Sequence, residues 1–129
     1  TSMSEQTYIG KIEELPNVTN GHFIENSVKK VVFGPDRFWP DYVMRCFILQ
    51  PGALSEPHAH PWPHYAVLMK GQGVFQIDGV ETPIEAGSYI HVPGGLNHNF
   101  WNTSETEEFV LLCIVPRIGD VNPLAGKGC

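Results

Sequence analysis

Short runs of β-branched and aromatic residues, separated by glycine and proline, fill most of this chain of 129 residues. The 13 glycines and 11 prolines fall largely between these runs. No stretch shows a sustained helical period, so the pattern is typical of an all-β sandwich or barrel. Because many short strands leave many exposed edges, we expect a barrel or a pair of packed sheets that removes them.

The clearest hairpin signal is Asp78-Gly79, which separates the runs Val74 to Ile77 and Val80 to Ile84. Further strands are expected at residues 31–33, 42–49, 64–69, 89–92, 98–102 and 109–115. Near the N-terminus, Tyr8 to Ile12 is expected to form a short edge strand. A helical turn at residues 13–15 should end before Pro16, since proline removes a backbone donor.

The length fits one domain. We expect a single domain over residues 1–129, with an N-terminal extension and edge strand at 1–30 and a barrel at 31–116. Residues 117–129 form a tail rich in glycine. The tail is expected to be either disordered or draped over a neighbour.

Charge and hydropathy exclude two classes of partner. The formal net charge is −6 and no basic run is present, which argues against a nucleic-acid groove. No apolar run approaches the ~20 residues of a membrane helix. The first residues lack the basic and apolar regions of a signal peptide, so we expect a cytoplasmic protein. Cys46 and Cys113 lie in apolar runs and are expected to be buried, reduced thiols.

Four of the six histidines fall in two clusters, with His58, His60 and His64 in the first and His98 in the second. Residues two apart on a strand point to the same face, so His58 and His60 can aim both imidazoles into one cavity. Neutral imidazole is the commonest protein ligand of first-row transition metals. The sequence therefore predicts a metal pocket inside a β-barrel. His91, by contrast, is expected at the surface.

The two clusters belong to longer motifs, Gly52-x5-His58-x-His60-x3-His64-x6-Gly71 and Gly87-x5-Pro93-x-Gly95-x2-His98-x3-Asn102. In order and spacing these resemble the two motifs of the cupin superfamily, which carry a Glu where His64 stands. The resemblance implies a single-domain cupin barrel, that is, a double-stranded β-helix or jelly roll. It also implies one divalent metal held by His58, His60, His64 and His98. The motif Gly, Pro and Asn positions would be structural.

The histidine at position 64 narrows the functional hypotheses. Four neutral imidazoles cancel none of the metal charge, which leaves a stronger Lewis acid. The segment His58 to His64 resembles small four-histidine cupins, some of which bind manganese and act as oxygenases on alkenes. Our first hypothesis is a metal-dependent oxygenase of the dioxygenase type, acting on a small apolar or aromatic substrate. Mn or Fe would suit that chemistry, whereas Ni, Zn or Co would suit Lewis-acid work.

Two alternatives stay open, because cupin membership does not settle the reaction. One is a non-redox metalloenzyme, such as a cyclase, isomerase or lyase, and the other is a non-catalytic cupin that binds a small molecule. Trp62, Phe75 and Phe100 are candidates to line the substrate pocket, since ligand pockets are mostly apolar. Candidate polar groups for that pocket are Arg45, Gln50, Gln72 and Gln76.

The catalytic residues stay unassigned, because no convincing pair of carboxylates or nucleophilic triad appears. We expect a small-molecule substrate and neither nucleic acid nor membrane as partner. The resemblance implies a homodimer formed by pairing sheets, with the segment Tyr8 to Ile12 as its packed or swapped edge.

Overall fold

The computed structural model describes residues 8–18, 24–57 and 59–121. Its strands are β1 (Ser27–Phe33), β2 (Tyr42–Leu49), β3 (His64–Lys70), β4 (Gln72–Ile77), β5 (Val80–Glu85), β6 (Tyr89–Val92), β7 (His98–Asn102) and β8 (Phe109–Pro116). Two short helices accompany them, the 3-10 turn η1 (Ile12–Glu14) and α2 (Arg117–Val121). None of the helices in the described ranges is long and apolar enough to cross a bilayer.

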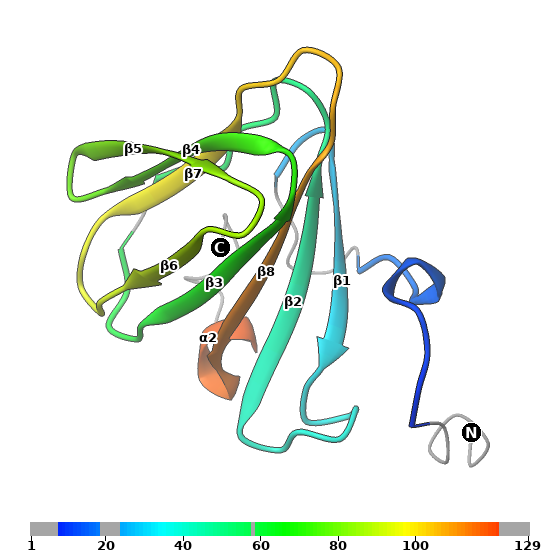
Figure 1. Ribbon diagram of the computed structural model, residues 1–129. Helices are drawn as coiled ribbons and strands as arrows, with labels where there is room; N and C mark the ends of the chain where they lie inside the picture. The colour runs from blue at the N-terminus through cyan, green and yellow to red at the C-terminus, as the bar shows by residue number, and fades with distance from the viewer. Residues whose placement is uncertain (1–7, 19–23, 58, 122–129) are drawn as a thin grey trace.

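The strands form two sheets that face each other (Figure 1). The larger sheet has the order β1-β2-β8-β3-β6 and the smaller one the order β5-β4-β7. Neighbouring strands pair antiparallel. The prediction of an all-β, double-sheet jelly roll is confirmed.

The expected hairpin joins β4 to β5. Ile77 pairs with Val80, and the two residues between them, Asp78 and Gly79, have φ of 52° and 85°. Positive φ at both central residues is the geometry of a type I′ turn, which favours Asp-Gly because Gly has no Cβ penalty there.

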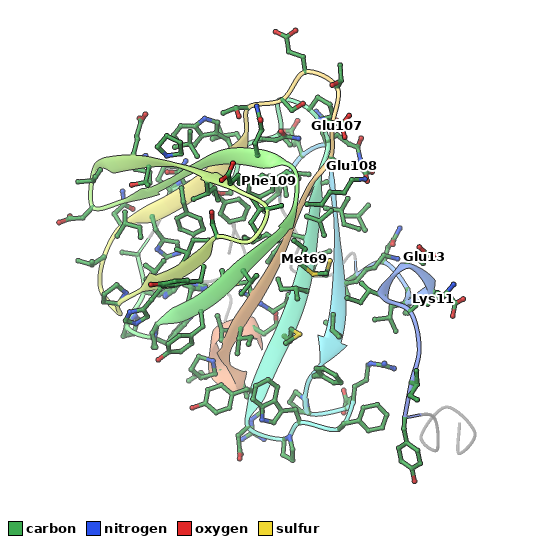
Figure 2. All side chains as sticks on the ribbon, in the orientation of Figure 1. Lys11, Glu13, Met69, Glu107, Glu108 and Phe109 are labelled. Atoms are coloured by element: carbon green, nitrogen blue, oxygen red, sulfur yellow. The ribbon has the colours of Figure 1, made fainter. Side chains whose placement is uncertain are left out.

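The core fills the space between the two sheets, as the side chains in Figure 2 show. Phe100 of β7 stacks on Phe75 of β4 and on Phe109 of β8, with ring centroids 5.3 and 5.8 Å apart. All three rings are buried. Full burial of such a side chain stabilises the fold by roughly 1.5–3 kcal/mol.

The motif residues that were expected to be structural have clear roles. At Gly71, with φ of 89°, a Cβ would lie 2.2 Å from the carbonyl oxygen of Glu108, so only glycine fits. The buried Asn102 donates to the carbonyl oxygens of Leu49 and Glu107 at 3.1 and 2.8 Å. Its own Oδ1 accepts from the Ser104 N–H at 2.8 Å, so this side chain ties β7 to the end of β2 and to the loop before β8.

The prediction of an edge strand at Tyr8 to Ile12 is wrong. Residues 8–11 are irregular and Ile12 begins η1, which lies at the expected helical turn before Pro16. A lysine side chain holds the turn itself, because the buried Lys30 ammonium donates to the carbonyl oxygens of Glu13 and Leu15. Lys11 and Glu13 point away from the sheets (Figure 2).

Two predicted boundaries also need correction. β1 begins at Ser27, four residues before the predicted start of the barrel at 31, because Ser27 to Lys30 already pair with β2. The start of the predicted tail is the helix α2, which ion pairs from Asp120 fix to β1 and β2. The remaining tail residues, 122–129, lie outside the described ranges.

Candidate metal centre

Three of the four predicted ligands converge in the barrel. His64 and His98 are the first residues of β3 and β7, and His60 lies in the loop that leads to β3. All three side chains are buried, and each offers a ring nitrogen within 4.8 Å of the other two. His58 lies outside the described residues. Since His60 is not part of a strand, the predicted strand alternation over His58 and His60 does not position it.

The outer ring nitrogens of His60 and His98 are held by backbone carbonyls. Nδ1 of His60 lies 3.0 Å from the Trp62 carbonyl oxygen, and Nδ1 of His98 lies 3.0 Å from the Leu96 carbonyl oxygen. A carbonyl oxygen only accepts, so each Nδ1 must carry the proton. In the neutral ring the lone pair is then on Nε2, which is the arrangement typical of metal-binding histidines.

The third histidine has an unusual outer partner. Nδ1 of His64 lies 3.2 Å from the sulfur of Cys113 on β8. The same sulfur accepts a hydrogen bond from Nη2 of Arg45 on β2 at 3.3 Å. A buried guanidinium is therefore linked to His64 through a single sulfur atom.

The inner ring nitrogens fit a shared cation. Nε2 of His60 and Nε2 of His64 are 2.6 Å apart. Two ligand atoms at right angles around an ion, each at the usual imidazole distance, are about 3 Å apart. Two facing lone pairs repel each other unless a proton or a cation lies between them. The three-histidine group can therefore hold a metal ion.

Aromatic rings surround these histidines. The Trp62 indole stacks on His60 with ring centroids 4.5 Å apart and planes 10° apart. The Phe75 ring stacks on His98 with ring centroids 6.5 Å apart, and Phe100 in turn stacks on Phe75. The three predicted pocket residues thus lie beside the histidines, and their contact with a substrate stays a prediction.

Beside this group lies a cluster of charges that the sequence did not predict as a unit. Asp120 of α2 accepts from Lys29 Nζ at 2.9 Å and from Arg45 Nη1 at 3.0 Å, both at the same oxygen, Oδ1. Burial raises the pKa of the Asp120 carboxyl, but Arg45 and Lys29 outweigh it and bring that pKa below its usual value. Arg45 is one of the candidate polar groups named from the sequence, and its place on a strand face with Val43 and Phe47, where it interrupts an apolar alternation, is a further signal of a buried role.

The other expected side chains have ordinary roles. His91 is exposed, as predicted, and stacks on Tyr65 of β3. Cys46 and Cys113 are buried thiols, also as predicted, and no disulfide joins them. Burial raises the pKa of the Cys46 thiol, and the Lys30 ammonium offsets only part of that rise. Of the candidate polar pocket groups, Gln50 bonds to Glu108 and Gln76 to Asn99.

Sequence comparison gives a family and one curated relative. The family model described as "Cupin domain" matches residues 45–115. The dimethylsulfoniopropionate lyase DddW of Ruegeria pomeroyi is 34% identical over 58 residues, which are 45% of this chain and 38% of the lyase. The chain therefore matches well under half the length of that relative.

Solved structures resemble the fold over most of the chain. The polyketide cyclase RemF from Streptomyces resistomycificus has a TM-score of 0.76 at 16% identity, covering 87% of this chain and 80% of the cyclase. A predicted oxalate decarboxylase from Thermotoga maritima has a TM-score of 0.72 at 19% identity, covering 84% of this chain and 97% of the other. At these identities the likeness concerns the fold alone.

Proposed function

This chain belongs to the cupin family, and on that basis we propose that it is a metal-dependent enzyme acting on a small organic substrate. His60, His64 and His98 would hold one divalent transition metal ion, with His58 as a fourth ligand. One observation carries the proposal: three buried imidazoles, from a loop and two strands, direct ring nitrogens at one another within 4.8 Å.

We favour an oxygenase as the reaction class. Once bound, a redox-active ion such as Mn or Fe supplies the activation of oxygen. The protein would hold the metal ligands in position and exclude water from them, because the Trp62 and Phe75 rings stack on two of the histidines. Such apolar walls suit an apolar or aromatic substrate. The outer hydrogen bonds keep the histidine Nε2 atoms aimed inward through each turnover.

The comparisons favour a second candidate, a non-redox lyase or cyclase. The curated relative is named a lyase and one structural neighbour a polyketide cyclase. In that case the ion held by these histidines would supply Lewis-acid chemistry at a carbonyl or hydroxyl group of the substrate, and a side chain of this protein would move the proton.

Oxygen dependence separates the two candidates. Protein stripped of metal and reloaded with Mn or Fe is assayed for O2 uptake with phenolic and alkenyl substrates. Uptake that requires both metal and substrate supports the oxygenase. Turnover that persists without oxygen, and with Zn in place of Mn, supports the lyase or cyclase instead.

A further inference from the structure

Two buried cations meet at one carboxylate beneath α2. Lys29 of β1 and Arg45 of β2 are 5% and 1% exposed, and both bind Oδ1 of Asp120. Among the described residues, the buried charged side chains are all cationic, with no Asp or Glu in the buried class. Two buried cations therefore share one carboxylate oxygen in a setting where charge is poorly screened, and a pair of cations placed in this way can bind a carboxylate.

The helix that supplies this carboxylate also touches the metal centre. A Cβ on Gly119 would lie 2.6 Å from Nε1 of Trp62, and Trp62 stacks on His60. Gly119 and Asp120 are consecutive, so α2 contacts both the Trp62 ring beside the histidines and the cation pair. The indole N–H of Trp62 is buried and has no hydrogen-bond partner within the described part of the chain. An unpaired buried donor is costly, and an acceptor that reached it would be bound favourably.

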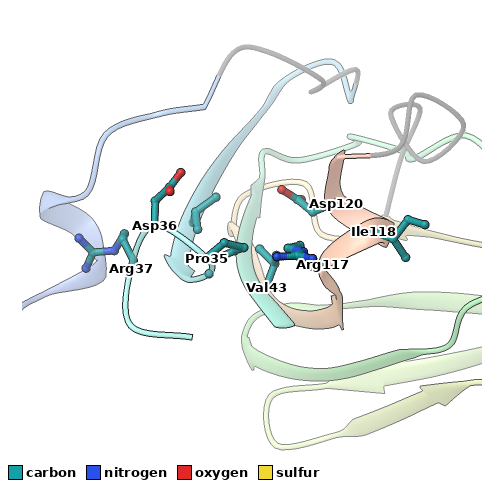
Figure 3. A pocket seen from close by; sticks show the side chains of 9 residues that line it. Pro35, Asp36, Arg37, Val43, Arg117, Ile118 and Asp120 are labelled. Atoms are coloured by element: carbon teal, nitrogen blue, oxygen red, sulfur yellow. The ribbon is translucent and has the colours of Figure 1, made fainter. Parts of the chain in front are cut away.

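A cavity of about 550 Å³ lies on the other side of α2. Figure 3 shows Asp36 and Arg37 on one side of it and Ile118 and Asp120 on the other. Val31, Val43 and Pro35 line it as well, but none of the three histidines does. The cavity thus leads to the Asp120 carboxylate, and α2 separates it from the histidines.

We propose that the substrate is a small organic carboxylate that binds Lys29 and Arg45 in place of Asp120, and that α2 is a lid held shut by its own carboxylate. The metal half of this site rests on the function proposed above. Exchange of one carboxylate for another leaves no buried cation unpaired, so opening the lid avoids the large penalty of an uncompensated charge. The Trp62 N–H gains access to an acceptor in the same movement.

The distances suit a short molecule. Only the sulfur of Cys113 separates Nη2 of Arg45 from Nδ1 of His64. A carboxylate of a few carbons on the cation pair therefore lies close to the Cys113 thiol, which contacts the outer nitrogen of His64. Because Asp120 competes with the substrate, the apparent affinity equals the intrinsic affinity multiplied by the fraction of molecules in which the lid is open.

The test measures carboxylate binding without metal or turnover. Propionate and benzoate are titrated calorimetrically into metal-free wild-type protein and Asp120→Asn, with propionamide and benzamide as uncharged probes of matched shape. We expect Asp120→Asn to bind both carboxylates about tenfold tighter or more, since a charged competitor has been removed, and the amides no tighter. In Lys29→Met/Arg45→Met/Asp120→Asn, which has no unpaired charge at this site, the gain should disappear.

Gly119→Ala provides a second route to the same state. It keeps the Asp120 charge, but its Cβ would lie 2.6 Å from the indole Nε1, so α2 and Trp62 must move apart. Where α2 moves, carboxylate binding should tighten as well, and this variant provides the test if Asp120→Asn does not fold. The proposal is overturned if the folded variants bind carboxylates no tighter than wild type, or if the amides gain as much. Metal binding is measured separately on the same proteins. Tighter carboxylate binding by the variants, in a protein that takes up no metal, would therefore support this site and contradict the proposed metal-dependent function.

Discussion

Nδ1 of His64 lies 3.2 Å from the sulfur of Cys113, whereas Nδ1 of His60 and Nδ1 of His98 each lie 3.0 Å from a backbone carbonyl oxygen. The thiol is the one outer partner of the three that a substitution can remove. It is buried and also bonded to Arg45. The orientation of one metal-binding histidine therefore depends on a side chain from the neighbouring strand β8.

Cys113→Ala should weaken metal binding without abolishing it. Loss of an outer partner of a metal-binding histidine typically lowers metal affinity about 10–100-fold. The measurement is a competition titration of Mn or Zn against a chelator. Cys46→Ala is the matched control, because Cys46 is equally buried on β2 and is not bonded to a histidine among the described contacts. Equal losses of affinity in both variants would contradict the role given to Cys113.

Gly71→Ala should destabilise the fold far more than Gly52→Ala. Both glycines have positive φ, at 89° and 79°, so each alanine carries a backbone penalty of roughly 1–2 kcal/mol. At position 71 the new Cβ also meets the Glu108 carbonyl oxygen at 2.2 Å, whereas nothing lies within 4 Å of it at position 52. Chemical denaturation of both variants measures the difference. Similar free energies of unfolding would show that the close approach at Gly71 is absent in solution.

The ion pairs of Asp120 should make stability depend on pH in a defined direction. Because its folded-state pKa is lowered, the stabilisation is present above the unfolded pKa of about 3.9 and is lost as pH falls through the folded value. Asp120→Asn removes it at neutral pH, where unpairing two buried cations costs on the order of 3 kcal/mol.

The corresponding measurement is the melting temperature of wild type and Asp120→Asn between pH 7 and pH 3. The difference should be constant near neutrality and shrink in acid. A difference that grows as the pH falls would contradict the assignment. Glu85→Gln is a suitable control, since Glu85 is exposed on β5.

Much of the barrel was predictable because its signals are local. The Asp78-Gly79 turn, the strand at Tyr42 to Leu49 and the inward-facing Ile90 and Val92 follow from turn chemistry and alternation. The histidines were predictable because a motif with fixed spacing carries them. Both signals are contained in a few neighbouring residues.

The errors fall where a distant side chain decides the local structure. Tyr8 to Ile12 has the composition of a strand, but it joins no sheet, and Lys30 from β1 instead holds the turn that follows it, at Glu13 and Leu15. Arg117 to Val121 has no helical period, and its short helix is fixed by ion pairs from Asp120 to Lys29 and Arg45, at sequence separations of 91 and 75 residues. No local pattern contains such contacts.

The most direct test of the metal centre is the metal content of the histidine variants. Wild type, His60→Ala, His64→Ala, His98→Ala and the exposed control His91→Ala are stripped with a chelator, reloaded with Mn and desalted, and bound metal is measured by mass spectrometry. We expect one ion per chain in wild type and His91→Ala, and substantial loss in each of the other three. Full occupancy in folded His64→Ala and His98→Ala, or no uptake by wild type, would contradict the account.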